Sequence, residues 1–152
     1  MTAQIRVTDL DRFAAILPSL GQLLVDSVNT GASLGFWMPM SLADAILYCT
    51  HPSIFPDAEQ LAAFEHVAAR CRLMRYGGDC YSYCLLALGH IDLVIEGGLQ
   101  AYDIQPLIPI IEAAGGVVTG RHGEDASNGG FVVAAATREL HAQALARLAE
   151  AG

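Results

Sequence analysis

The chain has 152 residues, of which 53% are hydrophobic and 16% charged, so it suits a folded domain and not a disordered segment. The formal net charge is −8 and lysine and arginine total only 8, which argues against binding to nucleic acid. Charged residues or histidine interrupt every run of about 18 apolar residues, so we expect no membrane-spanning helix. The first residues, MTAQIRVTDLDRF, lack the apolar centre of a signal peptide, and we expect a cytoplasmic protein.

The N-terminal part is predicted to contain helices followed by two short strands. Residues 8–29 have apolar residues at helical spacing, and Pro18 divides this pattern into two stretches. The run ASLGFWM, residues 32–38, is typical of a strand. Residues 41–46, SLADAI, predict a capped helical turn that leads into a second strand at ILYCT.

Helices and strands alternate over the remaining two thirds of the chain. Helices are expected at 57–71, 79–89, 101–116 and 137–151. Strands are expected at 72–77, 91–98, 117–119 and 131–136. Several of these strands are apolar throughout and should be buried on both faces. The pattern predicts an α/β fold, a layered sheet with helices packed on it.

One candidate site lies where a predicted strand gives way to a helix, at Gly77, Gly78 and Asp79. Glycines permit a tight turn there, and the first N–H groups of the helix can bind an anion or the Asp79 carboxylate. Asp79 is therefore either a helix cap or a ligand for a cationic part of a substrate.

Two further carboxylates stand at the end of a strand and near the start of a helix. Glu96 closes an apolar strand, and Asp103 follows seven residues later. Such positions often meet in one crevice of an α/β sheet, where two carboxylates could bind Mg²⁺. The alternatives are that Asp103 caps its helix and that Glu96 lies in solvent at the strand end.

The cysteines and histidines show no clear ligand spacing. We interpret Cys49, Cys71, Cys80 and Cys84 as reduced core thiols. A zinc site built from Cys49, His51 and a distant residue is the alternative. We interpret all five histidines as structural or surface residues, and no serine lies in a G-x-S-x-G motif.

A longer run resembles a known enzyme family. It is RYGGDCYSYCLLALGHIDLVIEGGLQAYDIQPLIPIIEAAGGVVTG, and it resembles the C-terminal part of the inositol-monophosphatase family. Within that family, RYGGDCYSY is similar to the histidinol-phosphate phosphatase branch. The resemblance runs from about Ile46 to residue 152. It implies the C-terminal half of that family's fold and Mg²⁺-dependent hydrolysis of a small phosphate monoester.

The resemblance also implies roles for single residues. Asp103 matches a ligand of the catalytic Mg²⁺. The positions that match the substrate-contacting wall are Arg75, Gly77, Gly78, Asp79 and Glu96. The sequence departs from the family at Gln100 and Ala101, where relatives carry a lysine and a proline or similar residues.

The family's upstream motifs, which resemble G-E-E and D-P-[IL]-D-G-[ST], do not occur in this sequence. Those motifs supply the other metal carboxylates and the residue that helps to activate water. A site with one carboxylate holds Mg²⁺ weakly. We therefore expect little or no phosphatase activity from this chain alone. The alternative is a folded module without enzymatic activity.

Residues 1–45 resemble a different family. The run DLDRFAAILPSLGQLLVDSVNTGASLGFWMPMSLADA is similar to the N-terminal segment of GNAT acetyltransferases. The chain thus resembles a junction of two family fragments, 1–45 and 46–152, in one folded unit, and acetyl transfer is a third possible function. Apolar surface that the missing phosphatase half would cover favours a homo-oligomer, most simply a dimer.

Overall fold

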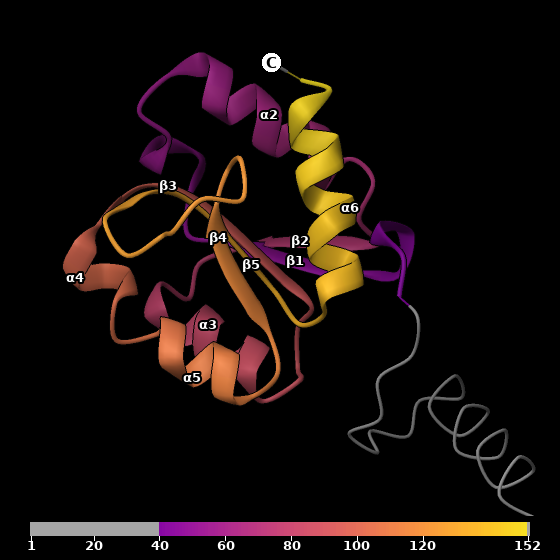
Figure 1. Cartoon of the computed structure of the whole chain (residues 1–152). Coiled ribbons are helices and arrows are strands. Elements are labelled where there is room, and N and C mark those ends of the chain that lie inside the picture. Colours follow the sequence, from indigo (N-terminus) through magenta and orange to yellow (C-terminus); the bar gives the residue numbers. More distant parts are fainter. Residues whose placement is uncertain (1–39, 152) are drawn as a thin grey trace, which may run out of the picture. The chain divides into compact units, whose positions relative to one another are not determined.

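The structure is a computed structural model that describes residues 40–151, and the elements predicted for 1–39 lie outside them. Within the described residues, five strands form one sheet in the order β2-β1-β3-β5-β4 (Figure 1). The strands are β1 (Ile46–Cys49), β2 (Leu73–Tyr76), β3 (Leu93–Gln100), β4 (Val117–Gly120) and β5 (Gly129–Ala135). Helices cover both faces of the sheet, so the predicted α/β layered fold is confirmed.

The sheet is mixed, with a parallel half and an antiparallel half. Strand β1 pairs in parallel with β2 and β3, whereas β5 pairs antiparallel with β3 and β4. Cys49 lies opposite Tyr76, and Tyr48 lies opposite Val94. The carboxyl ends of β1, β2 and β3 therefore reach the same edge of the sheet, where α/β proteins commonly bind ligands.

The helices are η1 (Leu42–Asp44), η2 (Pro52–Ile54), α2 (Ala58–Ala68), α3 (Cys80–Ala87), α4 (Ala101–Ile104), α5 (Ile108–Ala113) and α6 (Arg138–Ala149). Helices α2 and α6 begin where the sequence offers a side-chain cap. Asp57 precedes α2 and accepts from the Gln60 N–H at 2.8 Å, while Thr137 precedes α6 and accepts from the Leu140 N–H at 3.0 Å. Each bond satisfies an N–H group that the helix itself leaves unpaired.

Alternating residues of the central strands divide the core into two layers. Leu93 and Ile95 of β3 pack with residues of α2 and α6 on one face, and Val94 packs with residues of α3 and α5 on the other. In the first layer the ring of Phe64 stacks on Phe55 with centroids 5.0 Å apart. The apolar strands are thus buried on both faces, as their composition predicts.

The single helix expected at 101–116 is two helices in the structure. Helix α4 ends at Ile104 and α5 begins at Ile108. Pro106 lies between them, and a proline has no N–H to donate and clashes with the carbonyl four residues before it. Pro109 is tolerated because it lies in the first turn of α5, where the N–H would be unpaired.

The cysteines differ in burial although all four are free thiols. Cys49 is buried, and burial, followed by the nearby Glu96 carboxylate, raises the pKa of its thiol to about 12. Burial likewise raises the pKa of the Cys71 thiol to about 11. Cys80 is exposed at the start of α3, so its assignment as a core thiol is wrong.

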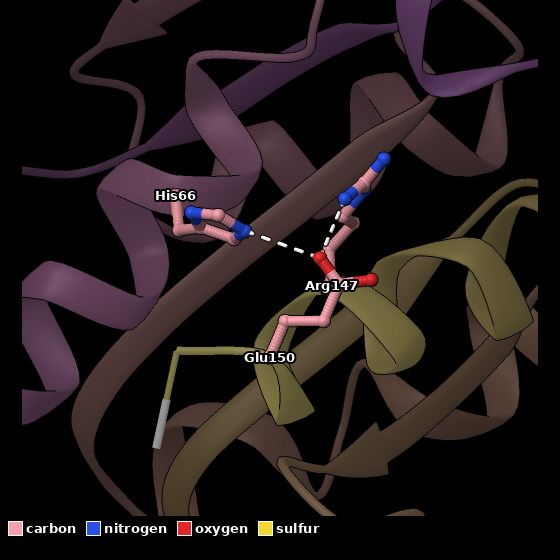
Figure 2. A network of polar contacts seen from close by, with 3 residues as sticks. All are labelled: His66, Arg147 and Glu150. Atoms are coloured by element: carbon pink, nitrogen blue, oxygen red, sulfur yellow. Dashed lines mark hydrogen bonds and ion pairs between the residues drawn. The ribbon is translucent and has the colours of Figure 1, made fainter.

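Helices α2 and α6 also meet through polar groups near the end of the chain. His66 Nε2 lies 3.4 Å from Glu150 Oε2, and the Arg147 guanidinium binds the same oxygen (Figure 2). Hydrogen bonds from Arg147 and then His66 lower the pKa of the Glu150 carboxyl. The group is exposed, so this network stabilises the fold less than the apolar contact beneath it. No helix in residues 40–151 is long and apolar enough to cross a bilayer.

Replacement of Phe64 by alanine should lower the free energy of unfolding by about 3 to 5 kcal/mol, because it leaves a cavity under Phe55 in the first core layer. Urea unfolding at constant m value measures the change. The matched control is Leu88→Ala, at a side chain that is 69% exposed and should shift stability by less than about 0.5 kcal/mol. Equal losses in the two variants would contradict this packing.

His141 should make the protein less stable in weak acid. Its ring is buried on α6 and its Nε2 lies 2.9 Å from Thr119 Oγ1, and burial, followed by the charge of Arg138, lowers its pKa. The folded state then binds fewer protons than the unfolded state, so stability is fully present above pH about 6.5 and is lost as pH falls through the lowered pKa. The measurement is urea unfolding between pH about 7.5 and 5.5.

In His141→Gln part of this loss should disappear, whereas His122→Gln, at an exposed loop residue, should keep it. An unchanged pH dependence in His141→Gln would show that other groups cause the loss.

Candidate active site

The candidate residues gather at the edge where the three parallel strands end. Thr50 follows β1, residues 77–79 follow β2, and Glu96 lies in the middle of β3, two residues after Val94, where the pairing of β3 with β1 ends. The Gly77 N–H donates to the carbonyls of Cys49 and Thr50, at 3.0 and 2.9 Å. These bonds extend the β1–β2 pairing past both strands and attach the glycine turn to Thr50.

Glu96 is buried, with only 2% of its surface exposed, so the interpretation of it as a solvated strand end is wrong. Its side chain lies on the same face of the sheet as Val94, toward α3, because neighbouring residues of a strand alternate. The Tyr83 hydroxyl donates to Glu96 Oε2 at 2.9 Å, and the Thr50 N–H donates to Oε1 at 2.9 Å. Each carboxylate oxygen therefore has one donor from the protein, and no ion pair among residues 40–151 involves Glu96.

Tyr83 keeps its proton in this setting. Its side chain is 2% exposed, and burial, followed by the negative charge of Glu96, raises the pKa of the phenol well above its ordinary value. A neutral phenol donates its hydrogen to a carboxylate, and bonds of this kind are among the stronger ones in proteins. Tyr83 therefore offsets part of the cost of burying Glu96.

The glycine turn has an unusual backbone. Gly77, Gly78 and Asp79 have φ angles of 96°, 104° and 43°. Asp79 is the one non-glycine residue with positive φ in the described part of the chain. A Cβ at position 78 would lie 2.5 Å from Ser82 Oγ, so this position needs glycine both for its backbone and for space. Strain of this kind is often found at functional sites.

Asp79 precedes α3, but its side chain makes no capping hydrogen bond. The carboxylate is exposed instead. The interpretation of Asp79 as a helix cap is therefore wrong, and the strained residue presents a negative charge at the strand-end edge.

Asp103 behaves differently. It is exposed on α4, and its Oδ2 accepts from the Gln100 N–H at 2.8 Å, so the interpretation as a helix cap is confirmed. Its neighbour Ile104 packs in the second core layer, so α4 lies on the face of the sheet toward which Glu96 points.

Arg75 is exposed on β2. Its neighbour Tyr76 contacts Phe64 in the first core layer, with ring centroids 6.3 Å apart. Alternation along the strand places the Arg75 side chain on the opposite face, which is the face of Glu96. The structure thus brings Arg75, Gly77, Gly78, Asp79 and Glu96 to one edge of the sheet.

These residues do not form a metal site by themselves. Residues 40–151 contain no group of three or more histidine, cysteine, aspartate or glutamate side chains placed to bind a metal ion. One oxygen of Asp103 is held by Gln100, and both oxygens of Glu96 accept protein hydrogen bonds. Mg²⁺ prefers about six oxygen ligands, so the described residues do not fit it without further carboxylates. The zinc alternative also lacks support, because Cys49 is a buried thiol and His51 Nδ1 accepts from the Ser53 N–H.

Two residues of the site were missed from the sequence, Thr50 and Tyr83. Thr50 contributes only its backbone N–H, which no residue pattern reveals. Tyr83 is an aromatic residue in an apolar helix and suggests core packing. Its bond to Glu96 joins residues 13 positions apart and depends on how α3 lies on the sheet.

Comparisons with known proteins agree with this architecture. The sequence model of the inositol monophosphatase family matches residues 40–152. The chain belongs to the inositol monophosphatase family. The match begins at residue 40, a few residues before Ile46.

Curated relatives include the bifunctional phosphatase IMPL2 of Arabidopsis thaliana, 42% identical over 116 residues, which are 70% of this chain and 33% of that protein. The histidinol-phosphatase of Mycobacterium tuberculosis is 36% identical over 75 residues, which are 49% of this chain and 28% of that protein. This chain therefore spans about a third of the length of these relatives.

Solved structures of inositol monophosphatases resemble this fold over part of their length. An inositol monophosphatase from Zymomonas mobilis is 38% identical with a TM-score of 0.69, over 72% of this chain and 44% of that one. An inositol monophosphatase from Anabaena is 22% identical with a TM-score of 0.62, over 74% of this chain and 48% of that one. The second likeness is one of fold alone.

Replacement of Asp79 by glycine should raise the free energy of unfolding by about 1 kcal/mol, because glycine adopts the positive φ without strain. Urea unfolding measures the change. Asp79→Asn is the matched control, since it removes the charge but keeps the strained side chain, and should change stability by less than about 0.5 kcal/mol. A loss of stability in Asp79→Gly would show that the carboxylate has a structural partner.

Proposed function

We propose that residues 46–152 form the substrate-binding part of a phosphatase that hydrolyses a small phosphate monoester such as histidinol phosphate or an inositol phosphate. The chain alone has little or no activity. The observation that carries the proposal is the buried Glu96 carboxylate, held by two donors at the strand-end edge beside the strained Asp79 turn.

The chemistry of this edge supports a role in binding the non-phosphate part of the substrate. Glu96 and Asp79 offer carboxylate oxygens, which accept hydrogen bonds from hydroxyl, ammonium or imidazolium groups. The Gly77–Gly78 turn lets the backbone approach a ligand closely. Two curated relatives of this chain are named histidinol-phosphatases, which supports a phosphorylated amino alcohol as substrate.

The proposed enzyme needs metal ligands that this sequence does not contain. The family resemblance implies Mg²⁺, which neutralises phosphate charge and activates water when it is bound. Asp103 would supply one ligand, but the G-E-E and D-P-[IL]-D-G-[ST] motifs do not occur in this sequence. The residues described here can bind and orient a substrate, whereas the remaining metal carboxylates must come from elsewhere.

The second candidate is a folded module without enzymatic activity that associates with itself in the cytoplasm. Large side chains exposed in this unit favour it: Tyr76 is 44% exposed, Tyr81 60% and Tyr102 76%. A second copy could cover such side chains, which are enriched at protein interfaces. Two further hypotheses depend on the resemblance of residues 1–45 to acetyltransferases: that the chain is a fusion of two family fragments, and that it transfers acetyl groups. Residues 1–45 lie almost wholly outside the described part of the chain.

The proposal is tested by phosphate release from L-histidinol phosphate and inositol monophosphate with Mg²⁺, and by calorimetric titration of L-histidinol phosphate without metal. We expect the chain to bind L-histidinol phosphate, with turnover close to the reagent blank. Any turnover above the blank should disappear in Asp103→Asn.

Efficient turnover that is unchanged in Asp103→Asn would contradict the proposal that this chain binds substrate but lacks most of the metal ligands. If L-histidinol phosphate does not bind, neither compound releases phosphate and light scattering shows a dimer, the module without enzymatic activity is the better description.

A further inference from the structure

We propose that Tyr83 is a positioning residue for substrate binding, and that its hydroxyl holds the Glu96 carboxylate of β3 in one orientation. This inference rests on the proposed function in so far as Glu96 contacts the substrate. The orientation of the carboxylate can be measured without any ligand.

Two hydrogen-bond donors hold the Glu96 carboxylate. Glu96 is 2% exposed, and among residues 40–151 it has two hydrogen-bond partners, the Thr50 N–H and the Tyr83 hydroxyl. The backbone N–H of Thr50 binds one oxygen only, and a carboxylate held at one oxygen can still turn about its last bond. The hydroxyl on the second oxygen removes that freedom.

Tyr83 is itself tightly packed. Its side chain is 2% exposed and packs in the second core layer with Leu86, Ile91 and Val94. Its phenol oxygen therefore reaches Glu96 from a fixed ring, and a rigid donor fixes the direction of the group that it binds.

Tyr83 also links Glu96 to the turn that carries Asp79. Tyr83 lies in the first turn of α3, the helix that begins directly after Asp79. Thr50, the other donor, accepts from the Gly77 N–H at 2.9 Å. The two sides of the glycine turn are thus joined to the same carboxylate, one through α3 and one through Thr50. A change in the orientation of Glu96 would therefore act on both sides of the turn that carries Asp79.

The ligand-free experiment follows the Thr50 amide by ¹H–¹⁵N NMR in the full chain. In Tyr83→Phe the carboxylate should turn and its bond to Thr50 lengthen, so the Thr50 amide proton should move upfield. Tyr48→Phe is the matched control, because Tyr48 packs beside the same core layer and its hydroxyl has no hydrogen-bond partner in residues 40–151. An unchanged Thr50 resonance in Tyr83→Phe would overturn the inference.

The second experiment is a double-mutant cycle on binding of L-histidinol phosphate without metal. Tyr83→Phe should weaken binding about tenfold in the wild-type background, the typical effect of a lost hydrogen bond to a charged group. In Glu96→Gln the same change should weaken binding less than about twofold, because Tyr83 acts through the carboxylate. Equal losses in both backgrounds would overturn the inference, since a merely structural tyrosine acts independently of Glu96.

The two experiments separate this inference from the proposed function. If the Thr50 resonance moves but the wild type binds no L-histidinol phosphate, Tyr83 still orients Glu96 and the proposed function is wrong. If Tyr83→Phe does not fold, the ¹³Cζ resonance of Tyr83 in Glu96→Gln replaces it. That resonance should move when the charged acceptor is removed, and a constant resonance would contradict the bond.

Discussion

The parallel half of the sheet ends at a buried carboxylate, and the arrangement of the site depends on how that carboxylate is held. Glu96 has a donor from the chain after β1 and another from α3, so three separate segments converge on one side chain. A buried carboxylate without partners would be costly, and each donor therefore also stabilises the packing of its own segment. Thr50 in turn accepts from Gly77, which brings the turn after β2 to the same point.

The contacts around Glu96 also explain why the backbone is strained at Asp79, in the turn between β2 and α3. The turn after β2 is held at its start by Cys49 and Thr50 and at its end by α3, which packs on the sheet through Tyr83. Only three residues join the end of β2 to the start of α3, and all three have positive φ. Two of them are glycines, which adopt such angles readily, whereas the third carries a carboxylate that no helix cap requires. The Asp79 carboxylate is therefore not explained by the start of α3.

The described unit has a well-packed core, whereas its carboxylates form no metal site. Apolar layers cover both faces of the sheet, and helices α2 and α6 are capped by the side chains of Asp57 and Thr137. The carboxylates of Glu96 and Asp103 accept hydrogen bonds from the protein, and that of Asp79 makes no capping bond. Within residues 40–151 no group of such side chains is placed to bind a metal ion. The upstream motifs that the family resemblance links to the other metal carboxylates do not occur in this sequence. The chain matches about a third of the length of its curated relatives.

The sequence by itself determined the order of helices and strands in residues 40–151, because apolar spacing, capping residues and glycines act locally. The motif around Gly77, Asp79 and Glu96 also determined the family. Only the tertiary structure decided that Glu96 is buried, that Asp79 caps nothing and that Pro106 divides one expected helix into two. It also decided that Thr50 and Tyr83 are the partners of Glu96. Those two residues lie 46 and 13 positions away in the chain, and contacts at such separations arise from the packing of α3 and β1 against β3, which no local pattern encodes.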